Sequence, residues 1–196
     1  MFLGLTGAAA CRIFCLPDNY EVHDASLNDI KFNLKPIFTR EMIAKLDEGA
    51  LVARSLEGSQ FMPGCVGLNN LKLTDFANSV IQLLARVKPL RDFCLLDSES
   101  VSGANQPTQL QSDSRAMLSL RFSQLIKKLW NPFNFKGQVS PHEFMEAVSI
   151  ASQKRFRSDD RVMQEKGYGG QADPLQFLAW LLNSLKTHRK VVEKTF

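Results

Sequence analysis

Two helix-start signals of the same pattern occur in the second half of the chain, and they limit its possible folds. Each places proline directly after an N-capping residue, at Ser140-Pro141 and at Asp173-Pro174. Ser140 and Glu143 also form a capping box, in which each side chain satisfies the other's backbone amide. Apolar residues then recur at helical spacing: Phe144, Met145, Ala147, Val148 and Ile150 after the first signal, and Phe177, Leu178, Trp180, Leu181, Leu182 and Leu185 after the second. The pattern predicts a helix after each signal.

Two further helices are predicted upstream. One ends before Asn131-Pro132 and has these apolar positions: Met117, Leu118, Leu120, Leu125, Ile126, Leu129 and Trp130. The other begins at the N-cap Thr39 and runs to about Arg54, with these: Met42, Ile43, Leu46, Leu51 and Val52. Residues 27–38, by contrast, look extended or irregular. The tryptophans Trp130 and Trp180 lie on apolar stripes, so we expect them in the core.

A fifth helix is predicted to open at Asp75. An acid in the first turn satisfies amide donors and complements the helix dipole. One buried stripe is expected to contain Phe76, Val80, Leu83, Leu84 and Val87. Pro89 is expected to end this helix.

Only one β element is predicted. It is a short β-prone run within residues 12–22, followed by the turn signal Pro17-Asp18-Asn19. Residues 97–113 are rich in Ser, Gln, Gly, Asn and Asp and read as a flexible loop. The fold class expected from the sequence is mainly α with a small N-terminal β element.

Composition excludes several classes of protein. The chain has 196 residues, 44% of them hydrophobic, which suits one packed domain, and no apolar run is long enough to span a bilayer. The net charge of +4 permits anionic partners without requiring them. Four cysteines at irregular spacing indicate reduced thiols, and the single close pair Cys11 and Cys15 is too little for a structural zinc site. We therefore expect no metal and no cofactor in this chain.

The residues around Asp75 resemble the cysteine box of the ubiquitin-specific proteases, usually written G-L-x-N-x-G-N-T-C-Y-x-N-S. The matching positions are Gly67, Leu68, Asn70, Thr74, Asn78 and Ser79. In this alignment Asp75 occupies the place of the nucleophilic cysteine, and Asn70 that of the oxyanion donor. Lys72 replaces a family glycine, which puts the close turn before the nucleophile in doubt.

Other runs resemble one branch of that family. Residues 170–178 are similar to the Q-Q-D-A-x-E-F-L motif, and residues 15–22 and 129–144 resemble inactive, spliceosome-associated members in which Asp occupies the nucleophile position. The resemblance implies the helical thumb of a papain-like protease fold, ending before the fingers and palm. It also implies that the box with the catalytic His lies beyond Phe196.

The same resemblance implies a division of the chain. Residues 1–23 would be the tail of a zinc-finger ubiquitin-binding domain, whose zinc ligands would lie upstream of Met1. Residues 24–63 would be a linker with one helix. Residues 64–196 would be the thumb part of the protease-like domain, including the flexible loop at 97–113.

The chemistry expected at the box is degenerate. A carboxylate is a far weaker nucleophile than a thiolate, and its charge opposes a developing oxyanion, so we expect no catalytic residue and a pseudoenzyme. Cys65 and Cys94 do not lie at predicted helix starts and are not expected to replace the nucleophile. His142 is expected to be a surface or capping side chain. His188 lies in the basic tail, too soon after the last motif to be the family's catalytic His, and His23 follows the strand with no visible partner.

The function implied by the resemblance is a non-catalytic scaffold of the spliceosomal tri-snRNP, acting in pre-mRNA splicing in the nucleus. Its partners would be tri-snRNP proteins, with no membrane. Two alternatives stay open: a deubiquitinase or its remnant, and a ubiquitin-binding module without hydrolysis, for which binding would be weak. RNA contact through Lys127-Lys128, residues 154–157 and the basic C-terminal tail also stays open, with Phe156 available to stack on a base.

Overall fold

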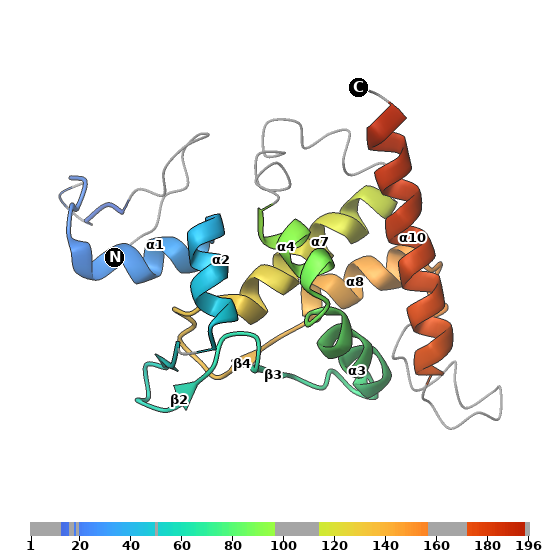
Figure 1. Ribbon diagram of the computed structural model, residues 1–196, viewed down its shortest axis with the longest axis horizontal. Helices are drawn as coiled ribbons and strands as arrows, with labels where there is room; N and C mark the ends of the chain where they lie inside the picture. The colour runs from blue at the N-terminus through green and yellow to red at the C-terminus, as the bar shows by residue number, and fades with distance from the viewer. Residues whose placement is uncertain are drawn as a thin grey trace.

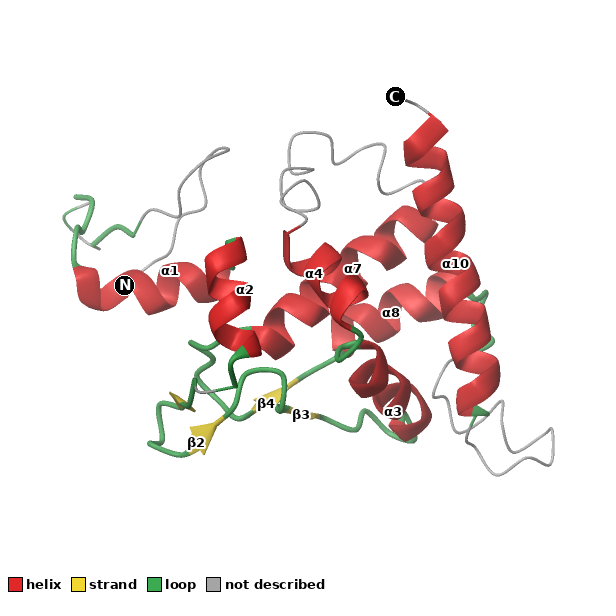
Figure 2. Ribbon diagram, viewed as in Figure 1, coloured by secondary structure: helices red, strands yellow, loops and turns green. Residues whose placement is uncertain are grey.

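The computed structural model describes residues 13–15, 18, 20–49, 51–96, 114–156 and 172–194, with side chains as far as Lys186. Helices dominate these parts of the chain, and the strands are short (Figure 2). The helices are η1 Ala25–Leu27, α1 Asn28–Leu34, α2 Arg40–Asp47, α3 Asp75–Leu84, α4 Lys88–Leu96, α7 Ser114–Trp130, α8 His142–Ala151 and α10 Pro174–Lys194. The strands are β1 Ala53–Arg54, β2 Gln60–Phe61, β3 Gly67–Leu68 and β4 Gln138–Val139.

Helix α7 is the centre of the helical core. It packs against α4, α8 and α10, and α10 also packs against α3 (Figure 1). The fully buried side chains of α7 and α8 include Leu118, Phe122, Ile126, Leu129, Phe144 and Val148. An aromatic cluster closes the other end of the core: Phe76 of α3 contacts Phe156 and Phe177, and these two contact Trp180, at ring separations of 5.2 to 6.3 Å. The predicted fold class is therefore confirmed.

The short strands fix the starting points of two helices. β1 and β2 form an antiparallel hairpin, and β3 and β4 pair in parallel with Gly67 opposite Gln138. β3 leads toward α3 and β4 leads directly into α8. The predicted N-terminal β element is also present, as an antiparallel bridge between Phe14 and Glu21.

Trp130, the last residue of α7, joins three parts of the chain. Its indole Nε1–H donates to the carbonyl of Ala85, at a distance of 3.0 Å. The backbone of Gly64 lies directly against the ring, with φ at +79°, and its amide donates to the carbonyl of Leu129 at 2.9 Å. The guanidinium of Arg91, a residue of α4, lies 4.6 Å from the centroid of the Trp130 ring. Trp130 is thus a core residue, as the sequence predicted.

Arg91 connects the contacts around Trp130 to α2. Its side chain is only 3% exposed, yet it lies 2.7 Å from the carboxylate of Asp47 at the end of α2. Asp92 accepts a hydrogen bond from Nε of Arg91 at 2.7 Å, whereas its 2.6 Å contact with Nη2 is electrostatic, since no acceptor has suitable geometry for that group. The hydrogen bond from Arg91 holds the pKa of Asp47 below its ordinary value.

The helix predicted from Thr39 to Arg54 is shorter than expected. Thr39 caps α2 as predicted, accepting from the Met42 amide at 3.2 Å, but the helix ends at Asp47. Gly49 follows with φ at +67°, a backbone conformation that terminates helices. The chain then turns into β1, so Leu51 and Val52 are exposed rather than buried.

Residues 24–63 contain more structure than the expected linker with one helix. Residues 28–34, predicted to be extended, form α1, and a second helix and the β1–β2 hairpin follow. Side chains from this segment join the core: Phe38, Ile43, Leu46, Ala53 and Phe61. Ile30, Phe32 and Leu34 alternate along the sequence, the spacing of a strand, which explains why the sequence did not show the short helix α1.

The stripe predicted for the helix at Asp75 is wrong at its C-terminal end. Phe76, Val80 and Leu84 are buried, but Leu83 is 58% exposed and Val87 is also exposed. Ala77 and Ile81 are buried in their place, because the helix rotates its Phe76–Ala77 face toward α10. The helix ends at Leu84, and Pro89 lies in the first turn of α4, where its missing amide costs no hydrogen bond.

Only one of the two predicted caps forms. Asp173 accepts from the Leu175 amide at 2.8 Å and starts α10 as expected. At α8 the residue in the N-cap position is Pro141, and no side chain caps the helix. Glu143 instead lies 3.1 Å from Lys128 and 3.4 Å from Arg121 on α7, since two cations outcompete one backbone amide. The loop predicted at 97–113 lies outside the described residues.

Replacing Gly64 with alanine should destabilise the chain strongly. A Cβ at this position would lie 2.6 Å from Cζ2 of Trp130, and it would also strain a left-handed backbone. We expect a loss of about 3 kcal/mol or more in the free energy of unfolding, measured by urea titration with circular dichroism. Gly58→Ala is the matched control, because Gly58 has φ at +81° but nothing within 4 Å of a Cβ. That control should lose about 1 kcal/mol, and equal losses in the two variants would contradict the steric account.

Removing the Asp47 carboxylate should make the free energy of unfolding less sensitive to a fall in pH. The folded pKa of Asp47 is lowered, so its contribution is complete above the ordinary Asp pKa and is lost as pH falls below about 4. Asp47→Asn should cost about 2 kcal/mol at pH 7 because it leaves Arg91 with one carboxylate. Urea titrations from pH 7 to pH 3 should show the two proteins converging in stability. Asp29→Asn, on the exposed face of α1, is the control and should run parallel to the original chain at every pH.

Candidate functional site

The segment from β3 to the start of α3 carries the sequence features of a catalytic site. Strand pairing holds its first residues, with the Asn69 amide donating to the Val139 carbonyl at 3.0 Å. Helix α3 is tied to the same strand from the other side, because Nε2 of Gln82 donates to the Val66 carbonyl at 2.8 Å. The intervening loop, residues 69–74, is therefore fixed at both ends.

Asn70 and Thr74 organise this loop. Oδ1 of Asn70 accepts from the Thr74 amide at 3.0 Å and from the Thr74 hydroxyl at 3.2 Å. The Thr74 hydroxyl oxygen in turn accepts from the Leu71 amide at 2.9 Å. The Thr74 side chain is buried, so the network is partly shielded from water. The side-chain oxygen of Asn70 thus stabilises the loop. Asn70 is the residue that the resemblance assigns to the oxyanion donor.

The close turn that Lys72 placed in doubt is present. Both Lys72 and Leu73 have left-handed backbones, with φ at +54° and +50°. For residues other than glycine, this conformation costs about 1 to 2 kcal/mol. The Asn70–Thr74 hydrogen bonds and the burial of Thr74 hold the turn against that cost.

Asp75 is the first residue of α3, as the sequence predicted. It is exposed, and its carboxylate lies in the first turn, where the partial positive charge of the helix end stabilises an anion. The Thr74 carbonyl accepts from the amides of Ala77 and Asn78, which completes the helix start. The geometry gives Asp75 a helix-starting role.

The other candidate nucleophiles have different surroundings. Cys65 is exposed and lies in the turn before β3, with its Sγ 3.6 Å from Nη2 of Arg86. Cys94 lies beyond the end of α3 and is buried inside α4. Neither thiol lies at a helix N-terminus. His142 is exposed in the first turn of α8, and His23 is exposed 4.0 Å from Glu21; the His188 side chain lies outside the described residues.

Metal sites and membrane-crossing helices are two further features by which the described part of the chain can be judged. Within it, no group of three or more His, Cys, Asp or Glu side chains could hold a metal ion. A membrane-crossing helix is also missing from this part, since none of its helices combines enough length with enough apolar character.

Some of the basic residues considered for RNA contact are buried or already ion-paired within the chain. Lys127 is buried, and Lys128 is ion-paired with Glu143 at 3.1 Å. Phe156 is 2% exposed within the aromatic cluster, so the suggestion that it stacks on a base is wrong. Arg155 lies over its ring, at 5.2 Å, and donates to Gln176.

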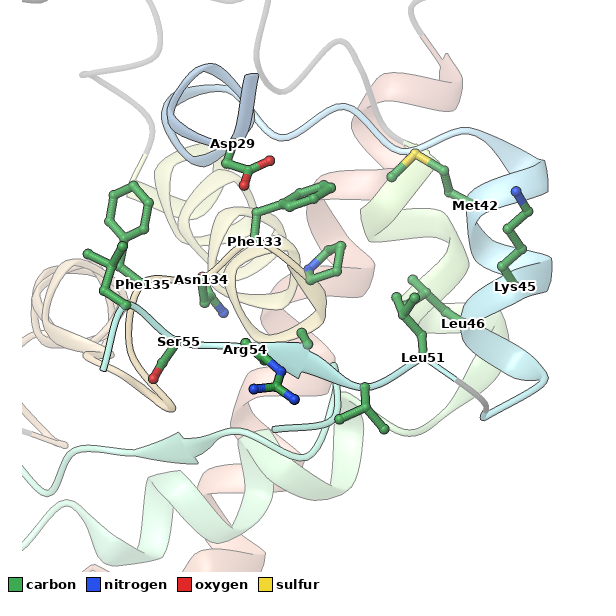
Figure 3. Close-up of a pocket in the computed structure, with 14 residues that line it drawn as sticks. Asp29, Met42, Lys45, Leu46, Leu51, Arg54, Ser55, Phe133, Asn134 and Phe135 are labelled. Atoms are coloured by element: carbon green, nitrogen blue, oxygen red, sulfur yellow. The ribbon is translucent and has the colours of Figure 1, made fainter. Parts of the chain in front are cut away.

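Sequence reasoning missed a surface cavity at the other end of the molecule. It has a volume of about 460 Å³ and lies between α2, the segment 51–56 and the loop 132–135, with Asp29 of α1 at its edge (Figure 3). No motif marks it, because its residues come from segments about 80 positions apart in the chain. The only sequence signal is the apolar pair Leu51 and Val52, which we had expected to continue a helix.

A protein-family model matches most of the chain, including the cysteine box. Residues 66–195 match the family model described as ubiquitin carboxyl-terminal hydrolase. In Homo sapiens, "Ubiquitin carboxyl-terminal hydrolase 39" is 43% identical over 174 residues, which cover 89% of this chain and 28% of that protein.

Two yeast relatives carry names from splicing. "Probable mRNA-splicing protein ubp10" of Schizosaccharomyces pombe is 34% identical over 89% of this chain and 30% of its own length. "Pre-mRNA-splicing factor SAD1" of Saccharomyces cerevisiae is 25% identical over 94% of this chain and 35% of its own length. This chain therefore spans about a third of the length of the curated relatives it matches.

A solved structure shares the fold. The "Crystal structure of an essential yeast splicing factor" superposes with a TM-score of 0.63 at 23% identity, covering 94% of this chain and 40% of that one. The arrangement of helices described above is thus found in an experimental structure.

Replacing Lys72 with glycine should stabilise the chain. Glycine adopts the left-handed conformation of the loop without steric cost, so we expect a gain of about 1 kcal/mol in the free energy of unfolding. Lys45→Gly is the matched control, because Lys45 lies inside α2 and glycine there should cost about 1 kcal/mol. Urea titration measures both, and a loss of stability in Lys72→Gly would show that the loop does not hold the strained turn described.

Proposed function

The chain belongs to the ubiquitin carboxyl-terminal hydrolase family, and from this premise we propose that it is a non-catalytic scaffold in pre-mRNA splicing. The names of its yeast relatives, "Probable mRNA-splicing protein ubp10" and "Pre-mRNA-splicing factor SAD1", support the process. Because the chain spans only part of those relatives, the role of the whole protein is a proposal throughout.

The observation that carries the non-catalytic part is the state of the cysteine box. The loop keeps its fixed ends, its Asn70–Thr74 network and its left-handed turn, while a carboxylate stands where the thiolate would be. An exposed carboxylate at a helix N-terminus is stabilised as an anion, which weakens it further as a nucleophile. The loop thus supports a scaffold in which the box serves folding.

Exposed apolar side chains at the end of α3 and on α4 support a role in assembly. Leu83 and Val87, near the end of α3, are exposed together with Phe93 and Leu96 of α4. Groups of exposed apolar side chains of this kind commonly mark surfaces that a partner or another part of the same protein covers. We propose that the partners are proteins of the tri-snRNP and that the protein acts in the nucleus.

Direct RNA contact is a smaller part of the proposal. Arg155, Lys154 and Lys136 remain exposed, and their charges could approach phosphates within an assembly. The ion pairing of Lys128 and the burial of Lys127 and Phe156 leave no aromatic platform among these clusters. We therefore propose that protein contacts dominate.

Affinity purification from nuclear extract tests the splicing role. The immobilised chain should recover proteins of the tri-snRNP, identified by mass spectrometry, well above empty beads. Gly64→Ala is the matched control, because the expected loss of folding would leave only non-specific apolar capture. Recovery of no snRNP protein by the folded chain would contradict the proposal, as would equal recovery by the two proteins once the variant is shown to be unfolded.

A further inference from the structure

The surface cavity near α2 is far from the cysteine box in the fold and has no part in the function proposed above. We call it the α2–β1 groove; its lining runs from Met42 to Leu46 on α2, through residues 51–56, to the loop 132–135. It is open to solvent and largely apolar, with Leu51, Val52, Leu56, Phe133 and Phe135 all partly exposed (Figure 3). Leu56 is the most exposed of these, at 78%. A groove of about 460 Å³ accommodates a few side chains.

Three charged side chains line the groove, each from a different element. Asp29 lies at the α1 end, while Lys45 lies on α2 and Arg54 on β1 (Figure 3). Within the described parts of the chain, none of these three side chains has an ion pair or a side-chain hydrogen bond. An occupant with one acid near Lys45, another near Arg54 and a base near Asp29 would therefore satisfy all three charges.

The backbone of β1 favours an extended occupant. In the β1–β2 hairpin, the Ser55 amide donates to the Ser59 carbonyl and Ala53 is paired with Phe61. The main-chain amide and carbonyl of Arg54, between these bonded positions, therefore point away from β2. The Leu56 amide, which has the same parity, donates to the Phe135 carbonyl on the groove side. An extended peptide in the groove would find the Arg54 main chain available for pairing.

We propose that the α2–β1 groove binds an extended, mainly apolar peptide segment of a partner protein, with an acidic side chain near Lys45 or Arg54. RNA fits poorly, because the lining is apolar and Asp29 would repel a phosphate backbone. The inference stands on the geometry of the groove alone, so it remains testable whether or not the splicing role is correct.

Selection from a phage-displayed library of random 12-residue peptides, against the immobilised full chain, provides the probes. Enriched peptides are then synthesised with a fluorescent label and measured by fluorescence polarisation. We expect enriched sequences with several apolar residues and at least one Asp or Glu. Replacing that acid with its amide in the peptide should weaken binding severalfold.

Matched variants of the chain locate the binding. Leu56→Ser and the pair Lys45→Glu with Arg54→Glu should each weaken binding tenfold or more, and all three side chains are exposed, so the fold should persist. Leu175→Ser and Lys136→Glu are the controls, because these residues are exposed outside the groove. The controls should bind within twofold of the original chain, and matching thermal melts confirm folding of all variants.

Three results would overturn the proposal. The first is a selection that enriches no peptide, and the second is binding that all four variants retain equally. The third is a labelled 12-nucleotide polyuridine that binds the chain and loses its binding in the Lys45→Glu and Arg54→Glu variant, which would assign the groove to RNA instead.

Discussion

The contact of Trp130 with Gly64 and Arg91 is the constraint on which the rest of the structure depends. The indole ends α7, donates to Ala85 after α3, and covers a glycine backbone where no Cβ fits. Arg91 stacks above the same ring and reaches Asp47, so α2, α4 and α7 share one buried charged group. A buried guanidinium is stable only with its partners in place. The joint therefore couples the N-terminal helices, which precede the family match, to the helical core.

This coupling explains how the cysteine box keeps its shape with Asp75 at the position that the resemblance assigns to the nucleophile. From Gly64 the chain passes through Val66, whose carbonyl accepts a hydrogen bond from Gln82 of α3, and enters β3. β3 then pairs with β4, the strand that leads into α8. The loop between β3 and α3 is thereby held at both ends, and the Asn70–Thr74 network holds its centre. Asp75 fits this frame as the first residue of a helix. A frame held in this way can persist after loss of the nucleophile, because none of its contacts uses a thiolate.

Sequence patterns predicted the presence of most helices and several of their starts, but not where α2 ends or which side chains the helices contact. The apolar stripes after Asp173 and before Asn131 were sufficient to identify α10 and α7, because long periodic segments bury one face whatever their neighbours. Glu143 was misassigned because the pattern shows a capping box, whereas Lys128 and Arg121 become its neighbours only after folding. The left-handed turn at Lys72 is present because the hydrogen bonds that Thr74 donates to Asn70 outweigh a local preference. The groove escaped prediction, since its walls meet only in the tertiary structure.

The central claim is that the cysteine box has become a structural element, and hydrolysis of a fluorogenic ubiquitin conjugate tests it most directly. The assay compares the original chain with Asp75→Ala and with a buffer blank, at neutral pH and with reducing agent present. The account predicts no fluorophore release above the blank from either protein, and no covalent labelling of Cys65 by a ubiquitin electrophile. Release by the original chain that Asp75→Ala abolishes, or specific labelling of Cys65, would contradict it.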